Sequence, residues 1–203
     1  MTGFLFSRRH PEYLKNEQIY RHCAEAYRGG PEYMAKTLIR HVSEIDLEFS
    51  ERRKRAYYFN YPRSIARRIT QYALAVPPVR SNADPAMVED WSRSGMRTNE
   101  VMRQLSTMLT VFGKVWVQID SPSFAGPVSR LEAAAGNLRP YVRILSPLDV
   151  TDWSFAKDGK LEWAIVREEF YDNSDPLVPG EKYECIKLFR RGRALVRRCR
   201  AYL

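Results

Sequence analysis

Residues 98–120, TNEVMRQLSTMLTVFGKVWVQID, contain the point at which the spacing of apolar side chains changes. Across 101–112 the apolar residues recur every three or four positions, which predicts a helix with Thr98 as its N-cap and Gly113 as its stop. From 115 to 119 an apolar residue stands at every second position, which predicts a strand. We therefore expect a central core helix followed directly by the first strand of a sheet.

The same change of period divides the whole chain. Segments with helical spacing or helix start signals precede it, at about 11–28, 31–39, 47–59, 62–75, 84–94 and 98–112. Strand patterns follow it, at about 115–119, 141–145, 161–170, 183–189 and 194–202. Runs of helices followed by runs of strands predict an α+β fold, with helices over about 11–112 and a largely antiparallel β region over about 114–203.

One domain accounts for these elements. A chain of 203 residues that is 44% apolar can bury a core of its own. We assign 1–112 to the helical part of this domain and 113–203 to its β-rich part. Because Ser, Pro, Gly and Ala are frequent between 121 and 138, we expect a flexible loop there.

The basic stretch 51–70, ERRKRAYYFNYPRSIARRIT, holds seven Arg or Lys and one acidic residue. Apolar residues nevertheless fall on one helical stripe at its end, namely Ile65, Ile69, Tyr72 and Ala73. The combination predicts a packed helix with a cationic outer face. Pro62 disfavours helical geometry at Tyr61, so we expect a fixed corner between two helical limbs.

The net charge of +9 is concentrated in two segments. Besides 51–70, the segment 182–203 carries eight basic residues and one acidic residue, which leaves the other residues slightly acidic. Such a directional field suits a polyanionic partner or an acidic protein surface. The alternative is that these side chains lie on two solvent-exposed faces and bind no partner.

Nucleic-acid binding is the first function that the basic stretch suggests. Its cations could pair with phosphates, and the rings of Tyr57, Tyr58, Phe59 and Tyr61 could stack on bases. Stacking platforms usually lie on sheets or loops, whereas these rings interrupt a helix, which disfavours sequence-specific readout. Two roles for these cations therefore remain: attraction of nucleic-acid phosphates without base readout, and ion pairing with a neighbouring subunit. The candidate subunit or DNA contacts are Arg52, Arg53, Arg55, Arg63, Arg67 and Arg68.

Enzyme signatures are mostly absent from the sequence. There is no phosphate-binding loop, Gly-x-Gly pair, His-Glu-x-x-His or Gly-x-Ser-x-Gly. The best enzymatic alternative is a metal-dependent nuclease using Asp149 or Asp152 with Asp158-Gly159-Lys160. Because Asp158-Gly159 is typical of a tight turn, which is a poor metal cage, we expect no catalytic site, metal or cofactor.

The three cysteines indicate neither a disulfide framework nor a zinc site. Cys185 and Cys199 could lie opposite each other across a hairpin, but we interpret the cysteines as reduced, small apolar side chains. The isolated histidines are expected at the surface or at helix caps.

No membrane segment is expected. The longest uncharged run, 69–79, is too short to cross a bilayer and contains two prolines. The apolar 1–6 segment precedes Arg8 and Arg9, which is the wrong order for a signal peptide, so we expect a cytoplasmic setting.

Several segments together resemble the tailed-bacteriophage portal proteins. They are His10-Pro11-Glu12-Tyr13, the 33–41 helix, Arg53-x-Arg55-Ala56-x-Tyr58-x-Asn60-x-x-Arg63-x-Ile65, Arg139-Pro140-Tyr141-Val142, and Asp152-Trp153. None is a catalytic signature, so the specificity lies in their order over roughly two thirds of the chain. Portal subunits are usually much longer, and the stem helices and clip that follow the wing region in that family are not within these 203 residues.

The resemblance implies the N-terminal, wing-type portion of a structural portal subunit. About a dozen copies would form a ring, a dodecamer, at one capsid vertex of the virion after assembly in the host cytoplasm. Double-stranded DNA would pass through this head–tail connector without sequence preference during packaging and ejection. The implied protein partners are terminase, the major capsid protein and a head-completion or adaptor protein. The alternative is a non-enzymatic intracellular nucleic-acid-binding module that uses the basic helix 51–70, and a phage-encoded enzyme comes third.

Overall fold

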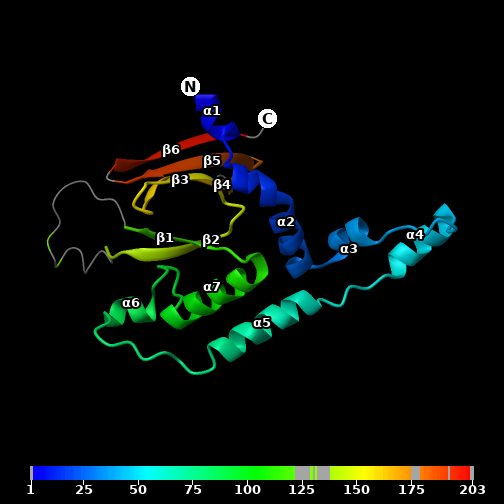
Figure 1. Ribbon diagram of the computed structural model, residues 1–203, viewed down its shortest axis with the longest axis horizontal. Helices are drawn as coiled ribbons and strands as arrows, with labels where there is room; N and C mark the ends of the chain where they lie inside the picture. The colour runs from blue at the N-terminus through cyan, green and yellow to red at the C-terminus, as the bar shows by residue number, and fades with distance from the viewer. Residues whose placement is uncertain are drawn as a thin grey trace. The chain divides into compact units, whose positions relative to one another are not determined.

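The computed structural model describes residues 2–121, 129, 131, 138–174, 179–191 and 193–201 (Figure 1). The chain forms two compact units, one of Met1–Gln18 with Leu145–Leu203 and one of Ile19–Ile144. We call them the sheet unit and the helical unit. Helices precede antiparallel strands, which confirms the α+β class. The loop expected at 121–138 lies almost entirely outside the described residues.

The helical unit begins within α2 and ends within β2. Its elements are α2 (Pro11–Arg28), α3 (Pro31–Thr37), α4 (Asp46–Arg55), α5 (Tyr61–Ala73), α6 (Pro85–Glu89), α7 (Thr98–Phe112), and the two-stranded sheet of β1 (Trp116–Asp120) and β2 (Tyr141–Leu145). α5 packs on α7 through small side chains. Ala66 and Thr70 are buried there, and the Thr70 hydroxyl lies 3.0 Å from that of Thr107.

The helix boundaries follow local signals with two corrections. α7 ends at Gly113, which has a φ of 71°, as expected. Its N-cap, however, is Arg97, whose backbone N–H donates to the Glu100 carboxylate at 3.0 Å. Thr98 instead donates its hydroxyl to the Met87 carbonyl at 3.0 Å.

The second correction concerns α6, which was expected to reach residue 94 and ends at Glu89. The carboxylate of Asp90 accepts the Gly95 N–H at 3.0 Å and so closes the following residues into a loop. A side-chain acceptor that competes with the helix ladder in this way ends the helix.

The break between two helical limbs is present as expected, but it lies before Tyr61, which is the first residue of α5 and not a non-helical residue. α4 and α5 are separate helices, joined by a non-helical segment that Figure 1 shows between them. The break is longer than predicted, because α4 ends at Arg55 and Ala56 is already extended, with a ψ of 138°. Asn60 caps α5 by accepting the Arg63 N–H at 2.9 Å.

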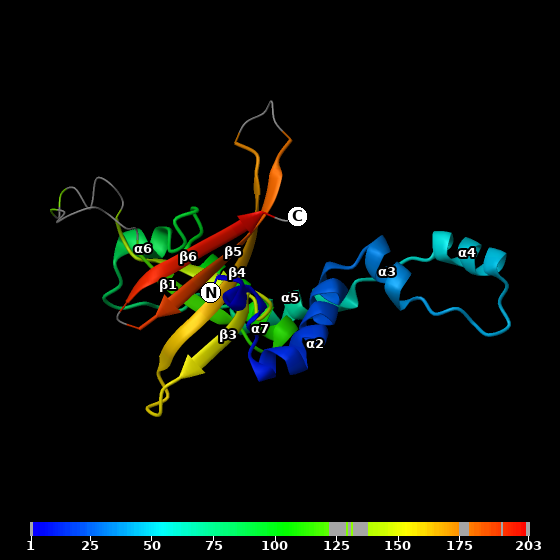
Figure 2. The same cartoon turned by 90° about the horizontal axis from the view of Figure 1, so that it is seen from above.

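The sheet unit contains four antiparallel strands in the order β3 (Val150–Phe155), β4 (Leu161–Asp172), β5 (Glu181–Arg190) and β6 (Arg193–Ala201) (Figure 2). The expected turn at Asp158-Gly159 joins β3 to β4, with Gly159 at a φ of 76°. β3 was not predicted as a strand. Its first four residues are all buried, so its sequence lacks the alternation that marks a half-buried strand.

The core of the sheet unit joins the two ends of the chain. Ile165 of β4 and Ile186 of β5 pack with Phe6 of α1 (Thr2–Ser7). The division at 112/113 drawn from the sequence does not anticipate that an N-terminal helix completes the C-terminal sheet.

The middle of β5 carries a buried carboxylate that the sequence did not indicate, and one cysteine of the pair that the sequence raised as possible hairpin neighbours. Glu184 is buried and forms ion pairs with Arg167 and, at 2.6 Å, with Arg200. Its neighbour Cys185 faces Cys199 across the β5–β6 ladder, and the two form a disulfide. The interpretation that these cysteines are reduced was therefore wrong, because the hairpin register places them directly opposite each other.

Candidate interaction surface

Residues 56–60, which join α4 to α5, and Tyr61, the first residue of α5, alternate in exposure. Tyr57, Phe59 and Tyr61 are exposed, whereas Tyr58 and Asn60 are half-buried. The backbone is extended at Ala56, whereas at Asn60 it turns, with a ψ of 67° and the Tyr61 N–H donating to the Phe59 carbonyl at 2.7 Å. The segment therefore has an inward row of polar anchors and an outward row of three rings. We call these three rings the aromatic ladder.

The inward row is fixed to the C-terminal end of α2. The Tyr58 hydroxyl donates to the Ala26 carbonyl at 3.1 Å, and the Asn60 amide donates to the Tyr27 carbonyl at 2.9 Å. Carbonyls in the last turn of a helix have no partner within the helix, so these side chains satisfy groups that would otherwise need water. Burial raises the pKa of the Tyr58 hydroxyl, and Tyr33 adds to the effect.

Gly29 makes this close approach possible. Its φ is 66°, and a Cβ atom there would lie 2.7 Å from the Asn60 amide nitrogen and 3.0 Å from the Tyr58 ring. Glycine alone combines this backbone conformation with the missing side chain. The end of α2 and the 56–61 segment therefore form one local structure.

The aromatic ladder is exposed over its whole length. The rings of Tyr57, Phe59 and Tyr61 are 75%, 64% and 66% exposed. The Tyr57 and Phe59 centroids lie 4.8 Å apart with the rings edge to face, and the Phe59 and Tyr61 centroids lie 6.1 Å apart with the rings nearly parallel. The sequence had indicated an interrupted helix here. Because Tyr58 is aromatic like its neighbours, residues 57–61 show no alternation of residue type, and only their exposure in the structure reveals the two rows.

Two of the six candidate arginines hold the helical unit together. Arg52 donates to both Glu44 carboxylate oxygens, at 2.8 and 2.7 Å, and to the Ile39 carbonyl at 3.0 Å. These hydrogen bonds lower the pKa of Glu44 to about 2. Arg63 donates to the Tyr27 carbonyl at 2.9 Å and to that of Arg28, so its guanidinium caps α2.

The other four candidates are directed at solvent. Among the described residues, Arg55 donates only to the Glu51 carbonyl, at 3.3 Å. Arg53, Arg67 and Arg68 are exposed and, in the described part of the chain, have no hydrogen bond or ion pair. The structure therefore separates the six into two structural residues and four that are open to a partner.

The apolar stripe of α5 does not pack as the sequence predicted. The expected face of Ile65, Ile69, Tyr72 and Ala73 is exposed. Ile65 is 58%, Ile69 47% and Tyr72 73% exposed. α5 instead meets α7 through Ala66 and Thr70, because small side chains allow the closer helix contact. We call Ile65, Ile69 and Tyr72 the α5 stripe.

α3 and α4, the two helices that precede the aromatic ladder, also lack a hydrophobic core among the described residues. None of the residues described in α3 or α4 is buried. Their contacts are polar pairs such as Lys54–Glu51 at 2.8 Å, together with the Tyr33 ring, whose centroid lies 4.9 Å from that of Tyr58 and 5.8 Å from that of His22. A groove of about 400 Å³ runs between the two helices, lined by Met34, Arg53 and Tyr57 among others. Helices of 7 and 10 residues without a buried face are marginal in water, so a partner surface would stabilise them.

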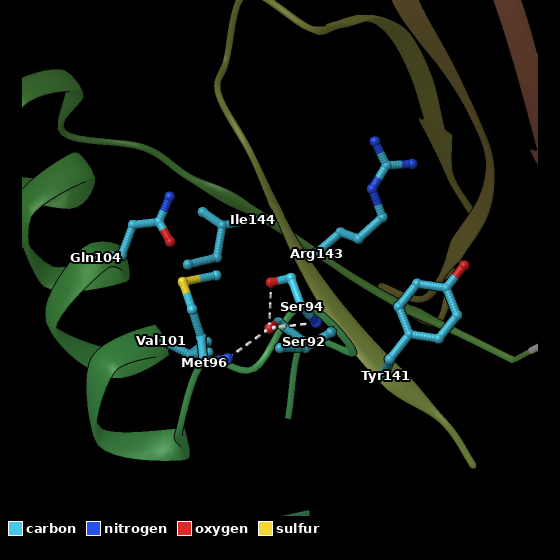
Figure 3. Close-up of a pocket in the computed structure, with 9 residues that line it drawn as sticks. Ser92, Ser94, Met96, Val101, Gln104, Tyr141, Arg143 and Ile144 are labelled. Atoms are coloured by element: carbon cyan, nitrogen blue, oxygen red, sulfur yellow. Dashed lines mark hydrogen bonds between the residues drawn. The ribbon is translucent and has the colours of Figure 1, made fainter. Parts of the chain in front are cut away.

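A second hollow in the helical unit, of about 460 Å³, lies between α7 and β2 (Figure 3). The Ser92 hydroxyl accepts the backbone N–H groups of Ser94 at 3.2 Å and Met96 at 3.3 Å. Beside it, Arg139 pairs with the Asp90 carboxylate at 2.9 Å. These polar groups hold the loop after α6 in place, so we assign this hollow a structural role.

The carboxylates of the nuclease alternative are not gathered into one site. Asp152 pairs with Arg8, and Asp149 accepts the Ser146 N–H at 2.7 Å. Asp158 lies in the β3–β4 turn near Lys160, at 3.5 Å. Within the described ranges, no group of three or more His, Cys, Asp or Glu side chains could hold a metal ion.

Comparisons with known proteins add no family to this description. No protein-family model matches the chain, and no curated protein matches it. Of the helices in the described part of the chain, none has the length and apolar character needed to cross a membrane.

Proposed function

We propose that this chain is a structural, non-enzymatic subunit of a ring of portal type, in its wing-type portion. Such a ring would lie at a capsid vertex of a virion, assemble in the host cytoplasm, and pass double-stranded DNA without reading its sequence. Terminase, the major capsid protein and a head-completion or adaptor protein would be its protein partners. The proposal rests on the ordered sequence resemblance and on one structural observation.

That observation is the exposed α5 stripe. Ile65, Ile69 and Tyr72 lie on a helix that packs through the neighbouring face of Ala66 and Thr70, so folding of the chain leaves them in water. Clustered apolar side chains of this size mark a surface for another protein. If the chain self-associates, a second copy would cover the α5 stripe. Head-to-tail contacts between copies can close into a ring.

The unpaired arginines support the DNA part of the proposal. Arg67 and Arg68 lie on α5 beside the stripe, and both lack a carboxylate partner within the described residues. Guanidinium groups attract phosphates of any sequence. These residues also favour the second candidate function, a nucleic-acid-binding module without ring formation.

Catalysis is not part of the proposal. The dispersed Asp149, Asp152 and Asp158 support this, because metal-assisted cleavage needs carboxylates that converge on one ion. Magnesium-dependent DNA cleavage by the purified chain that Asp158→Ala abolishes would refute it.

Light scattering on a sizing column, with negative-stain imaging of the same fractions, tests the assembly. We expect rings with a central hole for the unaltered chain. The variant Ile65→Asp/Ile69→Asp/Tyr72→Asp should be monomeric, whereas Phe155→Asp/Leu161→Asp/Tyr171→Asp, with exposed apolar residues of the sheet unit replaced, should still assemble. A chain that is monomeric at every concentration, but binds DNA, would favour the second candidate.

A further inference from the structure

We propose that the aromatic ladder, together with Arg53, Arg67 and Arg68, is a binding site for single-stranded nucleic acid. Successive bases would stack on Tyr57, Phe59 and Tyr61, and the guanidinium groups would pair with the phosphates. This site adjoins the α5 stripe, because Tyr61, Arg67 and Arg68 lie on the same helix, but it does not depend on ring formation.

The ladder offers three exposed rings within five consecutive residues. Side chains at every second position of an extended segment repeat at about 6.6 Å, twice the rise per residue. The observed centroid separations are 4.8 and 6.1 Å. Both separations are shorter than that repeat, and Tyr57 and Phe59 meet edge to face, so bases would stack on the outer faces of the exposed rings.

The ladder is also held rigid before any ligand arrives. Tyr58 and Asn60, which alternate with the rings, are hydrogen-bonded to the end of α2. Gly29 allows this contact, and Arg63 reinforces it. Binding therefore does not have to order the backbone of the segment, which removes much of the entropic cost that a flexible loop would meet.

The charges beside the ladder fit a polyanion. Arg53 lies before the rings in the chain, and Arg67 and Arg68 follow them. The acidic side chain nearest in sequence, Glu51, is paired with Lys54 at 2.8 Å. Because the three guanidinium groups have no carboxylate of their own in the described part of the chain, phosphates would be their first strong partners.

A single strand suits the rings better than a duplex. In a duplex the base faces are covered by neighbouring bases, and only edges and phosphates can be contacted. The arginines could bind either form, but the rings contribute only when bases are unpaired. The ladder should therefore create a preference for single strands and little preference among sequences.

The experiment is a fluorescence-anisotropy titration of the full chain with labelled dT20 and with a 20-base-pair duplex. Tyr57→Ala/Phe59→Ala/Tyr61→Ala should weaken dT20 binding by about 100-fold or more and duplex binding by less than about 3-fold. Arg53→Ala/Arg67→Ala/Arg68→Ala should weaken both and reduce the slope of log affinity against log salt for dT20 by about 2.

Two matched variants separate stacking from apolar contact. Tyr57→Phe/Tyr61→Phe keeps the three rings and should bind dT20 as the unaltered chain does. Tyr57→Leu/Phe59→Leu/Tyr61→Leu keeps the apolar bulk without aromatic faces and should bind about as weakly as the alanine variant. Circular dichroism of each variant checks that the fold is retained.

Three results would overturn the proposal. The first is no preference of the unaltered chain for dT20 over the duplex at equal salt. The second is a leucine variant that binds dT20 as tightly as the unaltered chain. The third is an alanine variant that binds dT20 normally but no longer self-associates, which would assign the ladder to a protein interface.

Discussion

The β3–β6 sheet and the segment from α3 to α5 differ in how far their apolar side chains are buried and their charged side chains are paired. In the sheet unit, Ile165 and Ile186 are buried, and the charge of Glu184 is matched by two arginines. In the α3–α5 segment, α3 and α4 bury no described residue, the α5 stripe and aromatic ladder are exposed, and three arginines have no partner among the described residues. In the sheet unit, these apolar and charged side chains are buried or paired within the unit. The α3–α5 segment leaves apolar and cationic side chains exposed, where a partner could contact them.

The sheet unit should lose most when one of its internal pairs is removed. Glu184→Gln leaves the guanidinium groups of Arg167 and Arg200 without their buried counter-ion, so we expect a loss of about 3 kcal/mol in the free energy of unfolding. The control Glu169→Gln breaks the half-exposed pair with Lys182 and should cost less than about 1 kcal/mol. Urea unfolding measures both. Equal losses would show that the sheet does not depend on the buried pair.

The two kinds of arginine in the basic stretch can be separated in the same way. Arg63→Ala removes charged hydrogen bonds to the end of α2 and should cost about 2 kcal/mol of unfolding free energy. Arg67→Ala removes an exposed side chain and should change it by less than about 0.5 kcal/mol. Thermal unfolding decides between them. If Arg67→Ala destabilises as much as Arg63→Ala, the division into structural and open arginines fails.

The alternation of the 56–61 segment makes a finer prediction. Tyr58→Phe removes the hydroxyl that donates to Ala26 and should cost about 1 kcal/mol. Tyr57→Phe, one residue earlier, removes a hydroxyl that faces solvent and should have no measurable effect on stability. Chemical unfolding of the two variants in parallel tests this, and similar losses would contradict the inward and outward rows.

The smallest expected effect is the local response of Glu44 to pH. Its pKa is lowered to about 2 by Arg52, below its ordinary value of 4.5. The folded state therefore favours the ionised carboxylate, and the stability that the pair contributes is present above pH 4.5 and is lost as the pH falls towards 2. Carboxyl-carbon NMR should show Glu44 titrating near 2, and Arg52→Gln should return its pKa towards 4.5. Unchanged titration in that variant would remove Arg52 as the cause.

The sequence predicted the elements well where local signals agree. Pro62 with Asn60 marked the corner, and Gly113 marked the end of α7, because backbone geometry at such residues is set locally. β3 was not predicted, because its first four residues are all buried and do not show the alternation of apolar and polar residues that marks a half-buried strand. The disulfide depended on strand register, which spacing between Cys185 and Cys199 does not specify.

The candidate surface was harder to predict than the fold. Charge singled out the stretch 51–70, but a count of cations cannot distinguish Arg63, which caps α2, from Arg67, which faces water. The α5 stripe was assigned to the core because helical spacing indicates an apolar face without indicating what covers it. Only the contact of Ala66 and Thr70 with α7, seen in the structure, shows that the α5 stripe is the face that stays exposed.

Hydrogen–deuterium exchange across a concentration series tests most directly the central claim that a partner completes the α3–α5 segment. At low protein concentration, amides of 31–72 should exchange fast, and those of β4 and β5 slowly. As the chain self-associates, protection should rise in 31–72 while the sheet changes little, and Ile65→Asp/Ile69→Asp/Tyr72→Asp should abolish the rise. Protection that rises instead in β3–β6, or is already high in 31–72 of the monomer, would contradict the account.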